Sequence, residues 1–273
     1  MLVNKLFPNY QQLKINHMKL FTLPILILAG LITGSCTDSV SEQPTRFLSD
    51  AEADLRLSSR STAITPEYPI NIDCDEWKEM TTHDEKVAFL ELSNDVYKSM
   101  ATDELACLCM AYPLNIDAYA FDDLATGLKR VISNAGCYQE LMMREDSAEG
   151  IVKALKAHDV PVYLQSSVSL VDKYTLLIDC NLLMQMLQFP EVSSTFTPDE
   201  ASEAASYLYY LAKVEREVLI SDSHSVMSPL MACEACLRPG TDISDIKGIT
   251  LTQNPSETMF ARLKTHNIKP FKL

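Results

Sequence analysis

The stretch Ser169–Phe189 reads SLVDKYTLLIDCNLLMQMLQF and is apolar on most sides when wound as an α-helix. Its polar residues Asn181, Gln185 and Gln188 fall in one stripe, because residues three and four apart share a helix face. A helix that is apolar almost all round must be enclosed by other elements. The stretch therefore predicts the central buried helix of an α-helical domain.

Amphipathic helices are predicted on both sides of this stretch. Phe121–Ala135 keeps a regular apolar stripe and ends at Gly136, which suits the residue after a helix. Thr197-Pro198-Asp199-Glu200 combines a capping box with proline at the first helical position, and the helix that it opens reaches Ile220. Further helices are predicted over 50–57, 82–92, 102–112 (with Thr102 as N-cap and Pro113 as its stop), 137–145, 147–158 and 254–266.

The expected fold class is all-α, with roughly eight helices in an irregular bundle or a solenoid-like helical array over residues 71–273. Beyond Ser221 the helical pattern weakens. Ile243–Gln253 is compatible with a small hairpin around Lys247-Gly248. No strict internal repeat is present.

The N-terminal region has the three parts of a bacterial export signal. Lys19 follows a plausible start at Met18, and an apolar run extends from Leu20 to Ile32. This run is too short to cross a bilayer, which needs about 20 helical residues. Residues 1–35 are therefore predicted to be a cleaved signal.

The ending Thr33-Gly34-Ser35-Cys36 resembles the lipobox of bacterial lipoproteins, although Thr33 is an unusual residue at its position. The resemblance implies that Cys36 is the first mature residue and carries acyl chains, which anchor a protein stably when there is more than one. An ordinary secretory signal with a chance cysteine is the alternative. Since Thr37 is not the aspartate linked to inner-membrane retention, the outer membrane is favoured over the inner.

Residues 36–70 are Ser-rich, contain three prolines and show little apolar periodicity, so they are predicted to be a flexible tether. Loss of residues 1–35 removes three lysines and no acidic residue, which changes the net charge from −14 to −17. Such a surface repels phosphate backbones and excludes nucleic acid as an expected partner.

Seven cysteines follow Cys36, an odd number that leaves at least one thiol unpaired within a monomer. Only Cys233 and Cys236 have the spacing of a metal or redox pair, and His224 is the nearest third ligand. A local disulfide or a buried structural pair is favoured over a zinc or redox site, because a single CxxC lacks a second pair of ligands.

The other groups of candidate functional residues are weaker indications of a site than this cysteine pair. Ser221-Asp222-Ser223-His224 contains the residue types of a hydrolase triad, but a polar loop is the favoured interpretation. His83 and His158 are expected near helix ends, and Asp122 and Asp123 in the first turn of a helix. The tyrosines at 207, 209 and 210 could form a stacking platform, yet helical spacing splits them over two faces, which favours packing with partial exposure.

One block, residues 77–149, resembles a group of uncharacterised, mostly helical lipoproteins of Bacteroidetes. The residues that carry the resemblance are Trp77, Thr82, Met100-Ala101-Thr102, Tyr112-Pro113, Asn134, Glu140-Leu141 and Arg144. Ala101 and Ser133 depart from the pattern, where serine and an aromatic residue are expected. The resemblance implies no activity and no catalytic residue.

The function expected from these features is that of a lipid-anchored cell-envelope protein that binds or scaffolds another envelope protein. No cofactor is expected, and an enzyme is disfavoured. Two alternatives stay open. One is a thiol- or metal-dependent enzyme around Cys233, Cys236 and His224, and the other is capture of a glycan or peptide by the tyrosines.

Overall fold

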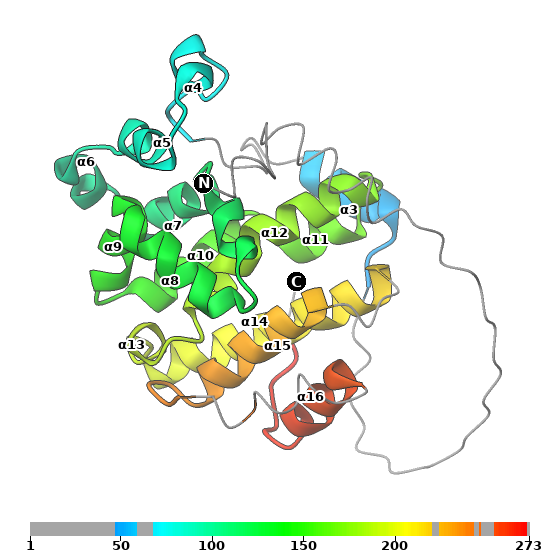
Figure 1. Cartoon of the computed structure of the whole chain (residues 1–273). Helices are drawn as coiled ribbons and strands as arrows, with labels where there is room; N and C mark the ends of the chain where they lie inside the picture. Colours follow the sequence, from blue (N-terminus) through cyan, green and yellow to red (C-terminus); the bar gives the residue numbers. More distant parts are fainter. Residues whose placement is uncertain (1–46, 59–67, 220–223, 243–245, 247–253, 272–273) are drawn as a thin grey trace. The chain divides into compact units, whose positions relative to one another are not determined.

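The computed structural model describes residues 47–58, 68–219, 224–242, 246 and 254–271 (Figure 1). These residues contain fourteen α-helices and one 3₁₀ helix and no strand, which confirms the all-α fold class. Ten of the fourteen have seven or more residues, compared with the eight or so predicted. The predicted hairpin and the predicted export signal fall on residues outside the described ranges.

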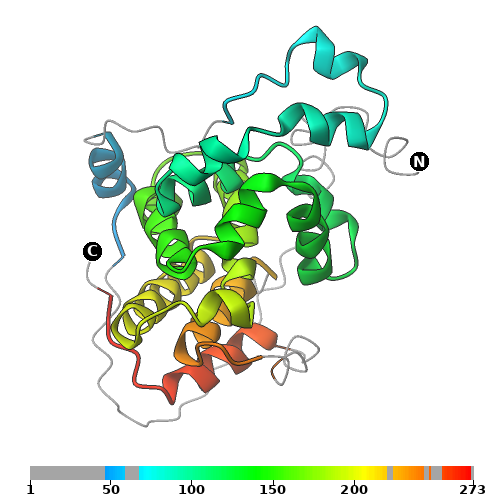
Figure 2. The same cartoon turned by 90° about the vertical axis from the view of Figure 1, so that its left-hand side faces the viewer.

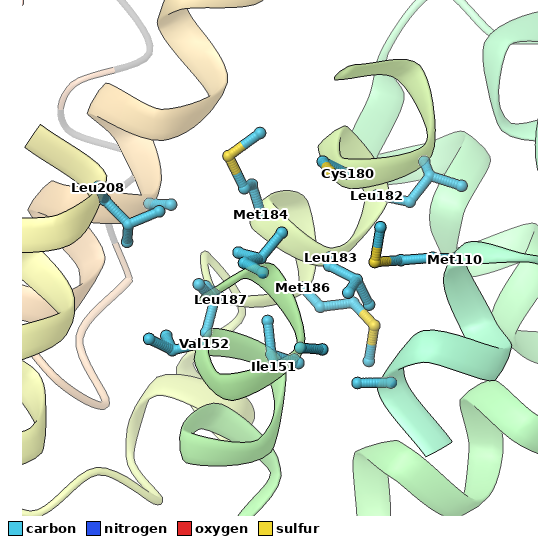
Figure 3. Close-up of a cluster of buried hydrophobic side chains, with 14 of the residues drawn as sticks. Met110, Ile151, Val152, Cys180, Leu182, Leu183, Met184, Met186, Leu187 and Leu208 are labelled. Carbon is cyan, nitrogen blue, oxygen red and sulfur yellow. The ribbon is translucent and has the colours of Figure 1, made fainter. Parts of the chain in front are cut away.

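The central helix is α12 (Leu170–Met186), as the sequence predicts. The side chain of Ser169 accepts a hydrogen bond from the Asp172 amide and so caps its first turn. Leu182, Leu183, Met184 and Met186 are fully buried. Figure 3 shows them facing Met110, Ile151 and Leu208 from three other helices. The only large hydrophobic residues of α12 that are exposed are Leu170 and Val171, in its first turn.

Three of the helices that precede the central one, α7 (Thr102–Met110), α8 (Leu124–Asn134) and α10 (Ser147–Ala157), pack against it. α9 (Gly136–Met143) packs on α7 and α8, and the 3₁₀ helix η1 (Asn115–Ala120) lies between α7 and α8 in the sequence. The Asn115 side chain donates to the Cys109 and Met110 carbonyls at 2.8 and 3.0 Å. These bonds satisfy two of the carbonyls that the end of α7 leaves unpaired.

Three corrections apply to this region. α8 begins at Leu124 and not at Phe121, which is exposed, because the Asp123 side chain caps the Thr126 amide at 3.0 Å. The N-cap of α7 is Ala101, and the Thr102 hydroxyl instead donates to the Asp146 carboxylate at 2.8 Å. Gly136 does not end a helix with a left-handed residue but is the first residue of α9.

The helices that follow the central one form a second group. α13 (Pro190–Ser193) is short, and α14 (Pro198–Leu219) begins at the predicted capping box, where the Thr197 amide donates to Glu200 at 2.8 Å. α14 lies alongside α15 (His224–Leu237), as Figures 1 and 2 both show. Ala201, Ala204, Ala205 and Ala212 are buried in α14, and small side chains allow a neighbouring helix to approach closely.

The sequence did not predict α15. Its residues from Val226 to Cys236 are almost all buried, so the sequence shows no periodic alternation of apolar and polar residues. Pro229 also lies inside the helix, where proline is unfavourable. The last helix, α16 (Pro255–Lys264), begins at Asn254 as predicted and packs on α15.

Part of the predicted tether is folded. α3 (Asp50–Ser58) packs on α11 (Val160–Gln165) with Ala53 fully buried. The Ser167 amide donates to Asp54 at 2.9 Å, and Arg56 lies 3.4 Å from Asp159. The folded body therefore begins at Phe47.

Candidate functional site

The cysteine pair singled out in the sequence lies in the interior of α15. Cys233 and Cys236 are 0% and 1% exposed, and burial raises the pKa of both thiols. The Cys233 thiol donates to the Ala205 carbonyl at 3.4 Å. His224 begins the same helix nine residues earlier, about 13 Å along the axis at 1.5 Å per residue. The structure therefore places the two thiols as buried, reduced residues, and the backbone separates His224 from them.

The three tyrosines do not line a groove. Tyr207, Tyr209 and Tyr210 are 2%, 9% and 5% exposed on α14. Phe271 covers the rings of Tyr207 and Tyr210, with centroids 5.3 and 5.6 Å away, and Phe260 covers Tyr209 at 5.6 Å. The predicted packing is confirmed for all three, whereas the predicted partial exposure is wrong, because all three are buried.

The remaining sequence candidates are dispersed. His83 begins α5, where its Nδ1 lies 3.4 Å from the Asp117 carboxylate. Asp123 caps α8, while Ser221–Ser223 and Cys36 lie outside the described residues. In the part of the chain that the structure describes, no three His, Cys, Asp or Glu residues are arranged to hold a metal ion. Within the same part, no helix has the length and apolarity needed to cross a bilayer.

A thiol–imidazole contact that the sequence did not predict joins α7 to the end of α10. The Cys107 Sγ lies 3.3 Å from Nε2 of His158, which is buried at the C-cap. Burial, together with Asp103 and Glu104, raises the pKa of Cys107 to about 11. A nucleophilic cysteine needs a lowered pKa, so this pair is not in an activated state.

Two pockets flank one short helix, α5 (His83–Leu90). The first has a volume of about 400 Å³ and the second about 540 Å³, and Ala88 lines both. Both are open depressions, unlike the enclosed cavities that bury most of a small molecule. Together we call them the α5 surface, whose lining residues are Glu76, Glu79, Met80, Asp84, Glu85, Val87, Ala88, Phe89, Glu91, Asn134, Gly136 and Gln139.

Local structure fixes the α5 surface. Thr82 and Glu85 form the predicted capping box, with the Thr82 amide donating to Glu85 at 2.9 Å. The buried Trp77 of α4 (Asp75–Glu79) packs against Phe89 with ring centroids 6.0 Å apart. These contacts hold α4 against α5 and set the shape of the second pocket.

A contact with α9 bounds the first pocket on one side. The Gly136 amide donates to the Glu91 carboxylate at 3.2 Å. A Cβ at position 136 would collide with that same carboxylate and with the Tyr97 ring. Glycine at position 136 therefore lets α9 begin beside the end of α5 with the Glu91 carboxylate in its observed place.

The electrostatics of the α5 surface are strongly acidic. Asp73–Glu91 contains seven carboxylates and only two lysines. Both lysines are engaged, because Lys86 lies 5.0 Å from the Trp77 ring centre and Lys78 lies 3.6 Å from Asp75. The Thr82 hydrogen bonds lower the pKa of Glu85, which keeps that carboxyl ionised. Glu79 and Asp84 have no hydrogen-bond or ion-pair partner among the described residues.

The floor between these carboxylates is apolar. Val87, Phe89 and Met80 are half-buried and line the two pockets. The combination of an apolar floor, acidic rims and an open shape fits an extended basic chain better than an enclosed small molecule. In the sequence, the acidic α5 surface is visible as the run of carboxylates around Thr82. That run is hard to distinguish because the whole chain is strongly negative.

Comparison with known proteins found no protein-family model, no curated protein and no solved structure that matches this chain.

Proposed function

We propose that this protein is a lipid-anchored binding module of the bacterial cell envelope, held to the membrane through Cys36. Its α5 surface binds a basic, extended segment of another envelope protein. The observation that carries the proposal is the pair of pockets around Ala88, each of which combines an apolar floor with ionisable carboxylates.

The sequence around Lys19–Cys36 supports the anchor. The position of Cys36 also limits how far the folded body can lie from the membrane. Ten residues, and so eleven residue-to-residue steps, lie between Cys36 and Phe47, where the folded body begins. At a maximum of about 3.5 Å per residue, the body lies within about 40 Å of an acylated Cys36. A module on so short a connection meets partners in or beside the same membrane at high effective concentration.

The chemistry of the partner is supported by the charges that the α5 surface leaves unpaired. Asp84 and Glu79 lie on the rims of different pockets, so one ligand segment with two spaced cationic side chains can pair with both. Apolar side chains between those cations would cover Val87 and Phe89. Because these ion pairs are partly exposed, binding should weaken as the ionic strength rises.

The first test is a binding titration with a labelled amphipathic peptide of lysine and leucine. We expect saturable binding to the soluble form that carries Cys36→Ser and lacks residues 1–35. The variant Asp84→Lys should bind about 5–30-fold more weakly, which corresponds to about 1–2 kcal/mol. A peptide with glutamate in place of lysine should not bind.

The chain offers a closely matched control for this variant. Asp199 occupies the second position of α14 behind the Thr197 capping box, as Asp84 does in α5 behind Thr82. Asp199→Lys therefore places a cation at an equivalent helix N-terminus without touching the α5 surface. Equal weakening by Asp84→Lys and Asp199→Lys would contradict the proposed surface and indicate only an unspecific charge effect.

The anchor is tested separately, by metabolic labelling with a fatty acid. We expect the label on the full chain and its loss in the Cys36→Ser variant. A full chain that takes up no label, or that keeps the label in the variant, would contradict anchoring through Cys36.

A further inference from the structure

Exposed apolar side chains gather at the end of the folded body where the N-terminal segment joins it. Eight large hydrophobic residues are exposed in the part of the chain that the structure describes, and four of them lie at this end. They are Phe47, Leu55, Leu170 and Val171, which are 40%, 72%, 57% and 50% exposed. The first two belong to α3 and the residues before it, and the other two lie in the first turn of α12. We call these four residues the α3 patch.

Two hydrogen bonds tie α3 to the segment that leads into α12. The Ser167 amide donates to the Asp54 carboxylate at 2.9 Å, and the Leu48 amide donates to the Gln165 side chain. Asp54 and Leu48 are each the direct neighbour of a patch residue, and α12 begins three residues after Ser167, at most about 11 Å of chain away. The four residues therefore lie close together, unlike the single exposed apolar side chains that are common on any protein surface.

The α3 patch begins where the predicted tether ends. Phe47 is both the first residue of the folded body and a member of the patch. Eleven residue-to-residue steps, at most about 40 Å of chain, connect it to Cys36. An acyl anchor at Cys36 therefore holds this end of the body close to the bilayer. Apolar side chains that are held beside lipid can leave water by entering the boundary between headgroups and acyl chains.

We propose that the α3 patch inserts into the surface of the bilayer that holds the acyl chains of Cys36, so that α3 and the start of α12 face the lipid. The inference rests on the anchor given under the proposed function and adds an orientation to it. Figures 1 and 2 both show α3 and α5 at different ends of the body. Docking through the α3 patch therefore leaves the α5 surface accessible to a protein partner.

The charges around the α3 patch determine which lipid it should prefer. Asp50, Glu52 and Asp172 are exposed beside the apolar residues, whereas Arg56 is engaged in an ion pair and Lys173 is buried. The rim of the patch is therefore negative, and anionic headgroups repel it. We expect insertion to be strongest in zwitterionic phosphatidylcholine and to weaken at low ionic strength when phosphatidylglycerol is added.

The test is quenching of tryptophan fluorescence by lipid with brominated acyl chains, which acts only at short range. The lipidated full chain is reconstituted into phosphatidylcholine vesicles with and without bromine. The single tryptophan of the chain, Trp77, is buried in α4, so the unchanged protein should emit equally in both vesicles. Leu170→Trp adds a tryptophan in the α3 patch, and the added emission should be lost in the brominated vesicles.

Met143→Trp is the matched control. Met143 is 72% exposed, as Leu55 is, but it ends α9, which lies on the opposite side of the body from α3 (Figure 1). Its added emission should persist in the brominated vesicles. Equal quenching at both positions would mean that the body has no fixed orientation and would overturn the proposal. A Leu170→Trp protein that co-floats with the vesicles without quenching would also overturn it, while leaving the anchor intact.

A second arm tests the α3 patch without the acyl chains. The soluble form that carries Cys36→Ser and lacks residues 1–35 is given an N-terminal histidine tag and tethered to the same vesicles through a nickel-chelating lipid. Leu170→Trp should again be quenched. Adding Leu55→Asp should lower the ratio of inserted to detached protein about tenfold, because removal of one leucine from an apolar contact changes an equilibrium by about that factor.

The two arms separate insertion from anchoring. Quenching of the tagged protein, together with a full chain that takes up no fatty acid, would overturn the anchor and uphold insertion of the α3 patch. No quenching in either arm would overturn insertion itself. A dimer of the soluble form that Leu55→Asp dissociates would show that a second copy of the chain covers the patch, which would likewise overturn the proposal.

Discussion

Arg262 of α16 donates to Oε1 of Glu234 in α15 at 2.7 Å from Nη2 and 3.1 Å from Nε. Glu234 lies between Cys233 and Cys236 and is fully buried. Arg238 approaches the same oxygen at 3.5 Å. The charged residue of the Cys-Glu-Ala-Cys motif thus attaches the last helix to α15, while its cysteines pack in the core.

Breaking this ion pair should be costly. Arg262→Met leaves a buried carboxylate with the weaker Arg238 contact alone, so the free energy of unfolding should fall by about 2–4 kcal/mol. Glu234→Met added to Arg262→Met should restore part of the loss, because no buried charge is then left without its partner. Glu257→Gln breaks an exposed ion pair with Arg216 at 2.9 Å and should cost less than about 1 kcal/mol. Urea unfolding of the unchanged protein and the three variants measures these losses, and equal losses for Arg262→Met and Glu257→Gln would refute the assignment.

Glu215 should make the protein less stable as the pH rises. It is fully buried in α14, neither carboxyl oxygen has a hydrogen-bond partner among the residues that the structure describes, and burial raises its pKa well above the usual value. Between the unfolded and the folded pKa, the native state holds a proton that the unfolded state has released. The contribution of Glu215 to the free energy of unfolding is therefore complete below about pH 4.5. Above that pH it falls, by at most about 1.4 kcal/mol per pH unit.

Glu215→Leu should remove this pH dependence and raise the free energy of unfolding at pH 8 by about 1–3 kcal/mol, because no polar group then needs to be desolvated. The gain should be smaller at pH 5. Glu217→Leu, on the exposed side of the same helix, should change stability by less than about 0.5 kcal/mol at either pH. Denaturation curves at both pH values test this prediction. A Glu215→Leu variant less stable than the unchanged protein would mean that the carboxyl makes a contact that the fold needs.

Arg144 should stabilise the end of α6 (Asn94–Ser99). Its Nη2 donates to the Tyr97 carbonyl at 2.9 Å, and its Nε donates to Glu140 at 2.8 Å. Arg144→Met should therefore cost about 2–3 kcal/mol. Arg144→Lys should recover less than half of this loss, since lysine lacks the planar fork.

Lys153→Met is the control for Arg144, because it breaks an i,i+4 ion pair that is mostly exposed, with Glu149 at 2.7 Å. It should cost no more than about 0.5 kcal/mol. Amide exchange should also quicken in α6 in the Arg144 variant. Unchanged exchange there would mean that the arginine only pairs with Glu140.

Cys107 should react slowly at neutral pH despite its contact with His158. Its pKa of about 11 leaves almost no thiolate at pH 7, so alkylation of the native protein should speed up steadily from pH 7 to pH 10. His158→Ala should not slow the reaction. Fast alkylation at pH 7 that is lost in His158→Ala would instead indicate an activated thiol and would revive the enzyme alternative.

Much of the helical framework could be predicted from the sequence because its signals are local. Thr82, Ser169 and Thr197 cap the helices that they were expected to open, and the apolar stretch after Ser169 is the central helix. The sequence did not predict α15, because a helix buried on all sides shows no periodic alternation of apolar and polar residues.

The candidate sites could be predicted only in part. The tyrosines were correctly assigned to packing, and the acidic run around Thr82 was visible as composition. Nothing in the spacing of Cys107 and His158 indicated that they meet, because the two residues come from different helices.

The sequence by itself determined where most of the longer helices lie and where the charge gathers, since caps and periodicity act over three or four residues. The tertiary structure alone decided that Gly136 lies against Glu91, that Glu234 holds α16, and that α5 has a pocket on each side. Each of these depends on which helices pack together. That choice is made by shape and buried area across the whole domain and leaves no mark within a single helix.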